Sequence, residues 1–314
     1  MELNNPPKTW LITGASSGLG LEMALSALRA GHRVIGTGRN IQNAALTHPE
    51  FENLGGKWLQ LDISQPKAEE ILKQLVTREE HQVPVHWVLV NNAGNTLLGT
   101  VEDMSHGQIS GYLETNLFGL IRVWRALLPT MRRHRTGTLV TISSIFGFIS
   151  KPEHMMYSAV KASTESLTES YGELLAPFGI RTMIIEPGGF RTTFPANNTK
   201  ADGGITEDYQ AKIEKWVNIV EAAGQDPTMV NGDPQRFGAR ILDAVEGRGL
   251  FKGIWTANME GKALRVQLGS DSYALFGKRL SQLNKAYAKM EVVASSTDVD
   301  CEGAEVSKGQ HWMD

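Results

Sequence analysis

The chain has very little cysteine. Its 314 residues include one, Cys301, which excludes an internal disulfide and a cysteine metal cluster. Such cysteine usage is typical of a reducing compartment, so we expect a cytoplasmic protein. The first ten residues, MELNNPPKTW, lack the basic region and apolar run of a secretory signal. No window approaches the ~18 uninterrupted apolar residues of a transmembrane helix, so no membrane span is expected.

An excess of charge of one sign is also missing. The formal net charge is −3, which argues against a nucleic-acid partner or an anionic membrane surface. Hydrophobic residues make up 41% of the chain and charged residues 21%, which are ordinary globular values. The length allows one large α/β domain or two small ones.

A glycine-rich turn follows the first apolar segment. Residues 9–13 (TWLIT) read as a buried strand, and Gly14-Ala-Ser16-Ser17-Gly18-Leu19-Gly then opens a helical pattern that runs to about Ala30. Glycines let a backbone approach a pyrophosphate, and a helix N-terminus presents free N–H groups to it. The sequence therefore predicts a dinucleotide site here, although a tight turn without a ligand would show the same residues.

The second strand, residues 33–37, leads into Gly38-Arg39-Asn40. Sites that bind NAD usually carry an acidic residue near this strand end to hold the ribose 2′-hydroxyl, and none is present. The guanidinium of Arg39 suits a 2′-phosphate, which favours NADP(H). The alternative is an ordinary exposed loop arginine.

Two further strands end in residues suited to a cofactor. Residues 57–61 lead to Asp62-Ile63, where an aspartate can meet an adenine amino group. After a helix from about 66 to 80, residues 85–90 lead directly into Asn91-Asn-Ala93-Gly94. Small residues at a strand's carboxyl edge leave room for a cofactor, although asparagine and glycine also form simple turns.

A serine, a tyrosine and a lysine follow the fifth strand, residues 138–142. This strand delivers Ser144 to the sheet edge, Tyr157 follows thirteen residues later and Lys161 four residues after that. If Tyr157 opens a helix, the two side chains share one face. A phenol with a pKa of about 10 must lose roughly 3 units to work near neutrality, and a nearby ammonium lowers it. We thus expect Tyr157 to protonate a carbonyl that Ser144 holds.

Asn116 lies in a long helical stretch, residues 105–134, among mostly apolar neighbours. A buried asparagine must be hydrogen-bonded. Two compatible readings remain open: a structural link between backbone groups, or a holder of an ordered water that passes protons to Lys161.

The sixth strand, residues 180–185, leads into Glu186-Pro187-Gly188-Gly-Phe190-Arg-Thr192, with Thr192 placed to bond a nicotinamide carboxamide. Residues 195–233 turn polar, apart from a helical segment with Ile213, Trp216, Val217 and Val220 on one face. We expect this segment to be a lid that hinges at Gly203 and Gly204 over an apolar pocket. Packing of the same face on the core is the alternative. The expected pocket residues are Phe146, Phe148, Met155 and Phe190.

Beyond this segment, a helix is expected from about 232 to 247, an edge strand over residues 264–268 and a helix from 270 to about 290. Residues 291–314 are acidic and poor in large apolar side chains, so a disordered tail is expected. Residues 1–290 would then form one domain.

Strands alternating with helices, glycine turn first, predict an α/β fold: a doubly wound parallel sheet of the Rossmann type with three αβα layers. Together with TGASSGLG, NNAG, Asn116, Ser144, Tyr157-x-x-x-Lys161 and PGGFRT, the chain resembles the short-chain dehydrogenase/reductase family over roughly residues 8 to 290. The resemblance implies a catalytic tetrad of Asn116, Ser144, Tyr157 and Lys161. It implies cofactor contacts at Gly14, Ser16, Ser17, Gly18, Leu19, Arg39, Asp62, Ile63, Asn91, Tyr157, Lys161 and Thr192.

The resemblance also implies a reaction, namely reversible hydride transfer between NADP(H) and a ketone, with no metal. The region after Thr192 looks most like that of fungal and bacterial members acting on bulky polyketide- or terpenoid-derived ketones. Two other readings stay open: a repurposed cyclase, epimerase or dehydratase, and an NADP(H)-binding sensor without turnover. A homodimer or homotetramer is expected, because the helix around Asn116 carries apolar residues in excess: Leu117, Leu120, Ile121, Trp124 and Leu128.

Overall fold

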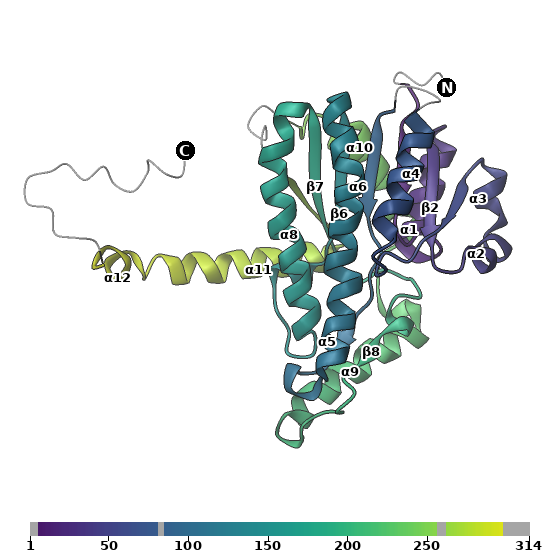
Figure 1. Ribbon diagram of the computed structural model, residues 1–314. Helices are drawn as coiled ribbons and strands as arrows, with labels where there is room; N and C mark the ends of the chain where they lie inside the picture. Colours follow the sequence, from purple (N-terminus) through teal and green to yellow (C-terminus); the bar gives the residue numbers. More distant parts are fainter. Residues whose placement is uncertain (1–5, 81–84, 256–261, 298–314) are drawn as a thin grey trace, which may run out of the picture.

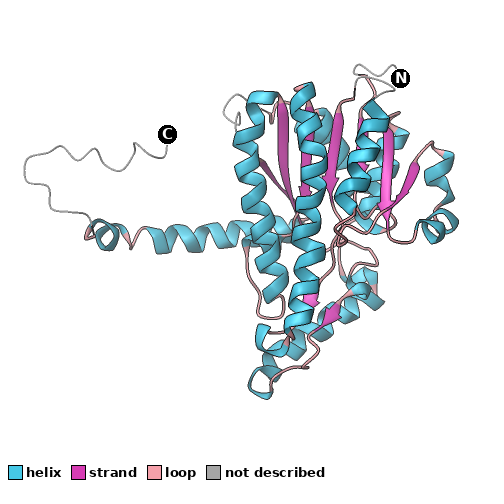
Figure 2. Cartoon of the chain, viewed as in Figure 1, coloured by secondary structure: helices cyan, strands magenta, loops and turns pink. Residues whose placement is uncertain are grey.

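The computed structural model describes residues 6–80, 85–255 and 262–297. Its centre is a seven-stranded sheet in which every pairing is parallel, with the order β3-β2-β1-β4-β6-β7-β9 (Figures 1 and 2). The predicted doubly wound sheet is confirmed, and the predicted edge strand is β9. The strands are β1 (Thr9–Ile12), β2 (Arg33–Gly38), β3 (Lys57–Gln60), β4 (Trp87–Asn91), β6 (Gly137–Ile142), β7 (Ile180–Pro187) and β9 (Leu264–Leu268).

Helices cover both faces of the sheet, because its central strands are apolar on both sides. Every residue of β1, β4 and β6 is buried. One hydrophobic cluster joins the sheet to α1 (Gly18–Arg29) and α10 (Pro234–Glu246). A second cluster joins it to α4 (Ala68–Glu80), α6 (Gly119–His134) and α8 (Met155–Leu175). These three helices lie in front of the sheet in Figure 1. The three layers make a single domain.

The strand order reverses beside β1, which pairs with β2 on one side and β4 on the other. In sheets of this kind, ligands bind at the carboxyl ends of the strands at that reversal. The glycine turn leaves β1 at this point, and the NNAG segment leaves β4 beside it.

The predicted long helix of residues 105–134 is an unbroken helical run. It consists of α5 (His106–Leu113), a π-helical turn (Glu114–Phe118) and α6. The Ser105 side chain caps its start by accepting a hydrogen bond from the Gln108 backbone N–H (3.2 Å).

The excess of uncovered apolar side chains expected on this helix is largely absent. Leu120, Trp124 and Leu128 are at most 7% exposed, because they pack into the chain's own core. This removes the premise of an interface built on α6. Phe118 is the large apolar side chain of the run that stays exposed.

The segment after β7 forms a small unit beyond one end of the sheet (Figure 1). Its strand β8 (Thr199–Lys200) pairs with β5 (Leu97–Leu98), and α9 (Gln210–Gln225) packs Ile213 and Val217 against Leu98. Part of the apolar face of α9 is therefore covered by the chain itself.

The remaining short elements of the described residues are α2 (Ile41–Thr47), α3 (Pro49–Asn53), α7 (Ile145–Phe148) and 3-10 turns at Val101–Asp103, Ala176–Phe178, Pro195–Asn197, Glu207–Tyr209, Pro227–Met229 and Gly249–Phe251.

The C-terminal helix α11 (Ser270–Tyr287) projects from the body of the molecule and is followed by α12 (Glu291–Ser295). The tail expected to be disordered from Glu291 thus begins with a helical turn. Its remainder, including Cys301, lies outside the described residues. Within the described ranges, no helix is long and apolar enough to cross a membrane.

Candidate active site

Ser144, Tyr157 and Lys161 meet at the carboxyl edge of β6. Ser144 is the second residue after the strand and caps α7, its Oγ accepting the Phe146 N–H at 3.2 Å. Tyr157 and Lys161 lie one turn apart on α8. The Lys161 Nζ donates to the Ile142 carbonyl (2.8 Å) and lies 5.7 Å from the centroid of the Tyr157 ring. The strand end and one helix therefore fix all three side chains.

Burial controls the protonation of this group. It raises the pKa of Tyr157 to about 12, although a hydrogen bond with Ser144 acts in the opposite direction. It lowers the pKa of Lys161 to about 8, against the attraction of the nearby Glu165 carboxylate. The predicted fall in the Tyr157 pKa is therefore wrong for this structure, because desolvation of the phenolate dominates. Tyr157 is protonated across the neutral range, as an acid must be.

Asn116 occupies the π-helical turn. Its Oδ1 accepts the Asn95 N–H (3.0 Å), and its Nδ2 donates to Asn95 Oδ1 (2.8 Å) and to the Tyr112 carbonyl (3.0 Å). These contacts agree with one of the two interpretations of Asn116, that of a structural link between backbone groups. Gly94 lies between Asn116 and Lys161: a Cβ on it would come within 2.9 Å of Asn116 Oδ1 and 4.0 Å of Lys161 Nζ.

A charged cluster beneath the site was not predicted. The Ser143 hydroxyl donates to Glu165 Oε1 (2.5 Å), while Arg265 of β9 donates to Glu165 Oε2 (2.9 Å) and to Glu186 Oε1 (2.5 Å). Glu165 and Glu186 are at most 3% exposed, and burial raises the pKa of both, that of Glu186 to about 7. The helical spacing from Lys161 to Glu165 was the available signal.

Glycines bring three loops together at the reversal of the strand order. Gly14 has a φ of +64°, and a Cβ there would lie 2.9 Å from the Ala93 Cα. Gly18 has a φ of +55°, and a Cβ there would lie 3.4 Å from Thr192. The turn that carries Ser16, Ser17 and Leu19, the NNAG segment and the loop after β7 thus converge on the N-terminus of α1, where backbone N–H groups attract phosphate.

Asn91, the last residue of β4, has unused hydrogen-bonding groups at this strand end. Its side-chain nitrogen and oxygen are both buried, and neither has a hydrogen-bond partner among the described residues. Both atoms are therefore open to a ligand or a water. Together with the glycine turn and the N-terminus of α1, they fit a nicotinamide dinucleotide.

The residues expected at the adenine end follow the carboxyl ends of β2, which pairs with β1, and of β3, which pairs with β2. Arg39 is exposed just after β2. Asp62 Oδ1 accepts hydrogen bonds from the Ser64 N–H (3.0 Å) and hydroxyl (2.7 Å), so one carboxylate oxygen is already engaged. Ile63 is buried under α6, close to Gly119.

The loop of Pro187 and Gly188 is held by α11. Asp271 Oδ2 accepts the Gly189 N–H at 2.8 Å, and the Ser272 hydroxyl donates to the Glu186 carbonyl at 2.7 Å. A Cβ on Gly188 would lie 2.1 Å from Asp271 Oδ1. The loop therefore requires glycine and depends on the C-terminal helix for its position.

Aromatic side chains surround Tyr157. Its ring centroid lies 6.4 Å from that of Phe146, 5.7 Å from that of His154 and 6.5 Å from that of Phe194. His154 was not predicted; its position directly before the tyrosine helix gave no separate signal. Met155 is 37% exposed beside this group.

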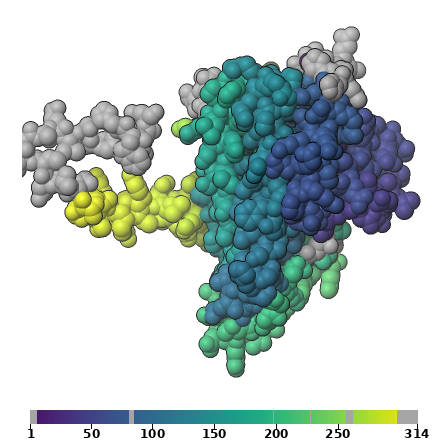
Figure 3. Space-filling view, viewed as in Figure 1, coloured from purple at the N-terminus to yellow at the C-terminus, as the bar shows by residue number. Residues whose placement is uncertain are grey.

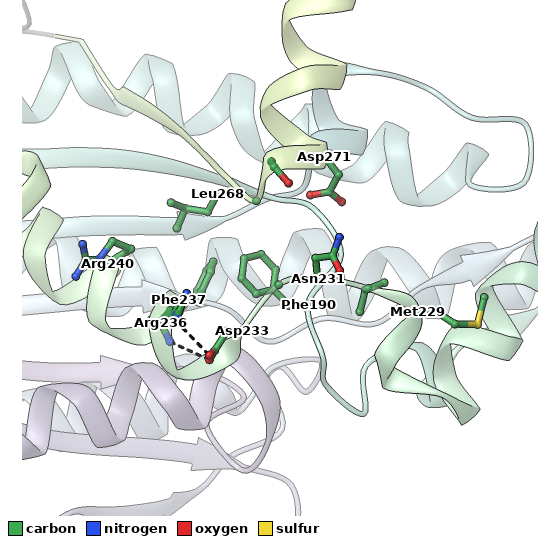
Figure 4. Close-up of a pocket in the computed structure, with 13 residues that line it drawn as sticks. Phe190, Met229, Asn231, Asp233, Arg236, Phe237, Arg240, Leu268 and Asp271 are labelled. Atoms are coloured by element: carbon green, nitrogen blue, oxygen red, sulfur yellow. Dashed lines mark hydrogen bonds and ion pairs between the residues drawn. The ribbon is translucent and has the colours of Figure 1, made fainter.

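The other two expected pocket residues point elsewhere. Phe148 stacks on Phe276 of α11, with 4.2 Å between centroids. Phe190 packs edge-on against Phe237 in the core, at 5.0 Å, and lines a cavity of about 340 Å³ between the starts of α10 and α11 (Figure 4). None of the four expected catalytic residues lines that cavity, so the place of Phe190 in a pocket beside Phe146 stays a prediction.

A doubly wound sheet whose glycine turn meets a serine–tyrosine–lysine group at the carboxyl ends of its strands is typical of dinucleotide-binding oxidoreductases. The family model "short chain dehydrogenase" matches residues 8–203, and the chain belongs to that family. The chain is 43% identical over 188 residues to oxidoreductase claN of Passalora fulva, an alignment that covers 59% of this chain and 84% of the relative. It is 32% identical over 243 residues to 3-ketodihydrosphingosine reductase of Bacteroides thetaiotaomicron, covering 76% and 84%. A solved short-chain dehydrogenase from Streptomyces avermitilis superposes with a TM-score of 0.77 at 31% identity, covering 94% of this chain and all of the other.

Proposed function

We propose that the protein is an NADPH-dependent reductase of ketones on bulky, largely apolar small molecules, including secondary metabolites, and that it oxidises the matching secondary alcohols in reverse. The observation that carries the proposal is the buried, protonated Tyr157 beside Ser144 and Lys161 at the nucleotide crevice. A ketone that receives a hydride must also receive a proton, and Tyr157 is placed to give it.

Each residue of the group has a separate task. Tyr157 donates its proton to the carbonyl oxygen, and Ser144 holds that oxygen through a hydrogen bond. Lys161, fixed by the Ile142 carbonyl, places a positive charge beside the phenol and favours its ionisation as the proton leaves. The Asn116 Oδ1 accepts one hydrogen bond from the chain, and its second lone pair suits an ordered water between it and Lys161.

NADPH, when bound, supplies the hydride, and the chain supplies position and charge. The residues proposed to hold it are those of the convergent loops, with Asn91 and Thr192 toward the nicotinamide half and Arg39 at the 2′-phosphate. The Arg39 side chain is exposed and forms no ion pair with any residue that the structure describes, so its charge is available to an incoming phosphate.

The substrate class follows from the surroundings of Tyr157. Phe146, Phe194 and Met155 offer apolar surface, and the similarity to a 3-keto reductase supports a ketone as the reacting group. Closing an apolar substrate into this cleft excludes water from the hydride step.

The test is NADPH oxidation with a panel of hydrophobic ketones, in the wild type and in Tyr157→Phe. General acid catalysis contributes about 10²–10⁴-fold, so turnover is expected to fall by at least ~100-fold while NADPH affinity is kept. Lys161→Ala is expected to reduce both. Tyr209→Phe, which changes an exposed phenol, is the matched control. Near-normal turnover in Tyr157→Phe would show that the acid is elsewhere.

A further inference from the structure

Helix α11 leaves the body of the molecule with nothing packed against most of its length (Figures 1 and 3). Every residue from 277 to 297 is exposed. An isolated helix of this length is marginal in water, since most helical stability in proteins comes from packing an amphipathic face. We therefore expect this helix to pack against a partner.

Large apolar side chains recur along α11 at the spacing of a coiled coil. Tyr273, Phe276, Leu280, Leu283 and Tyr287 follow one another at intervals of three, four, three and four residues. We call these five residues the α11 seam. Tyr273 and Tyr287 are 74% and 81% exposed, and Leu280 and Leu283 are 42% and 39% exposed. A strict seam with this period fits the matching seam of another helix.

The rest of the helix is arranged to leave the seam accessible. Lys278, Lys285 and Lys289 lie on the opposite side, so their charges stay in water when the seam is covered. The positions that flank the seam include Gly277 and Ala286, whose small side chains allow a second helix to approach closely.

We propose that the α11 seam pairs with the α11 seam of a second copy of this chain, in antiparallel orientation about a two-fold axis. The body of the molecule is much broader than the helix and extends above and below its base (Figure 3), so antiparallel pairing places the two bodies at opposite ends. The register that superimposes the two seams sets Leu280 against Leu283 of the partner subunit and Phe276 against Tyr287 of the partner subunit.

The exposed area agrees with such an interface. An aromatic side chain buries about 150–250 Å². At their observed exposures, Tyr273 and Tyr287 of two chains together contribute roughly 500–800 Å². A small specific interface needs about 1,200 Å², so the tyrosines supply roughly half and the leucines and Met290 add to it.

The pairing reaches the catalytic cleft. Phe276 belongs to the seam and stacks on Phe148, in the short helix that Ser144 caps. In the antiparallel register, the far end of the second helix lies over this stack. The second copy would thus complete one wall beside the site.

Sedimentation equilibrium of the full chain tests the proposal. The wild type is expected at twice the chain mass of 34.5 kDa, or a multiple of it, and Leu280→Glu/Leu283→Glu is expected to halve the observed mass. Ser281→Glu/Gln282→Glu adds the same charge outside the seam and should leave the mass unchanged. A thermal midpoint equal to that of the control shows that the seam variant is folded. A monomeric wild type, or a mass that the seam variant does not change, overturns the proposal.

Cross-linking tests the orientation. In a Cys301→Ser background, the reduced Leu280→Cys and Leu283→Cys proteins are oxidised each alone and, in a third sample, after they have been mixed. A disulfide between the two different variants is expected, and cross-links only within each variant overturn the antiparallel register.

Flotation with phosphatidylserine vesicles tests whether a lipid surface, and not a second copy of the chain, covers the α11 seam. A wild type that binds vesicles as a monomer, with binding lost in Leu280→Glu/Leu283→Glu, assigns the seam to a lipid surface and overturns the pairing.

Discussion

Glu165 lies one turn beyond Lys161 on the same face of α8, and its carboxylate opposes the fall in the Lys161 pKa that burial causes. The carboxylate is itself held in place by the Ser143 hydroxyl and the Arg265 guanidinium. Since Arg265 also binds Glu186, just before the Pro187–Gly188 loop, one charged cluster supports both Lys161, the lysine proposed to act in catalysis, and the expected nicotinamide loop.

Removing the Glu165 charge is expected to change the pH dependence of the reaction. In Glu165→Gln, the pKa of Lys161 falls further below its usual range, because burial is no longer opposed. The alkaline limb of kcat/KM should therefore move to lower pH. Glu169→Gln removes another carboxylate that binds Arg265, but an exposed one, and serves as the control. An alkaline limb at the same pH in both variants would contradict the role of Glu165.

Glu186 is expected to make the protein less stable as the pH rises. Burial raises its folded pKa from 4.5 to about 7, so the native state binds more protons than the unfolded state between these values. Stability from this group is present below pH 4.5 and declines as the pH rises through 7, by at most roughly 3 kcal/mol. In Glu186→Gln this decline should be absent.

Urea unfolding at pH 5 and pH 8 measures this decline in the free energy of unfolding. The value for the variant is subtracted from that for the wild type, because the other titrating groups are common to both. Glu221→Gln, which changes an exposed ion pair with Lys200, should keep the wild-type dependence. The same pH dependence in Glu186→Gln as in the wild type would refute the assignment.

Arg39 is expected to set the cofactor preference. Its guanidinium is exposed at the end of β2, where an acid would favour NADH. Arg39→Ala should weaken NADPH binding by about 10-fold or more, as expected for the loss of a charged hydrogen bond to phosphate, and leave NADH binding nearly unchanged. Tryptophan fluorescence titration with both cofactors measures this. Arg78→Ala, an exposed arginine on α4, is the control. Equal affinities of the wild type for both cofactors would defeat the idea.

The sheet and its motifs were predictable because local signals specify them. Four- to eight-residue apolar runs ending in glycine, asparagine or serine mark parallel strands and their carboxyl ends, as at Gly14, Asn91 and Ser144. The order of these motifs then placed them at one edge of one sheet, which the structure confirms.

Other features depend on tertiary packing that the sequence does not display. The pKa of Tyr157 rises because desolvation outweighs the hydrogen bond from Ser144, a balance set by the whole cleft. Phe190 packs edge-on against Phe237 of α10, a contact between segments far apart in the sequence. The apolar residues of α6 are covered by α4 and the sheet, whereas those of α11 remain uncovered.

The last prediction concerns the expected lid. The segment from 199 to 206 is tied to the body: the Gly203 N–H donates to the Asp103 carbonyl (2.8 Å), and the Thr206 hydroxyl donates to Asp103 (2.6 Å). Gly203 is therefore a poor hinge, and we expect any mobile part to be α9 and its flanks. The buried contacts of this helix are those of Ile213 and Val217 with Leu98. Its other ties are exposed, and they include the Glu221 ion pair with Lys200 and the Trp216 ring under Lys151 (5.3 Å). Few buried contacts imply low local stability.

Hydrogen exchange followed by mass spectrometry separates a lid from a packed helix. Peptides from α9 should exchange faster than those from α10 in the free protein and gain protection when NADPH and a hydrophobic ketone are both present. Trp216→Ala removes the contact with Lys151 and should speed exchange further, whereas Lys212→Ala, which changes an exposed position, should not. If α9 is as protected as α10 before any ligand is added, the helix is a fixed part of the domain and the lid is ruled out.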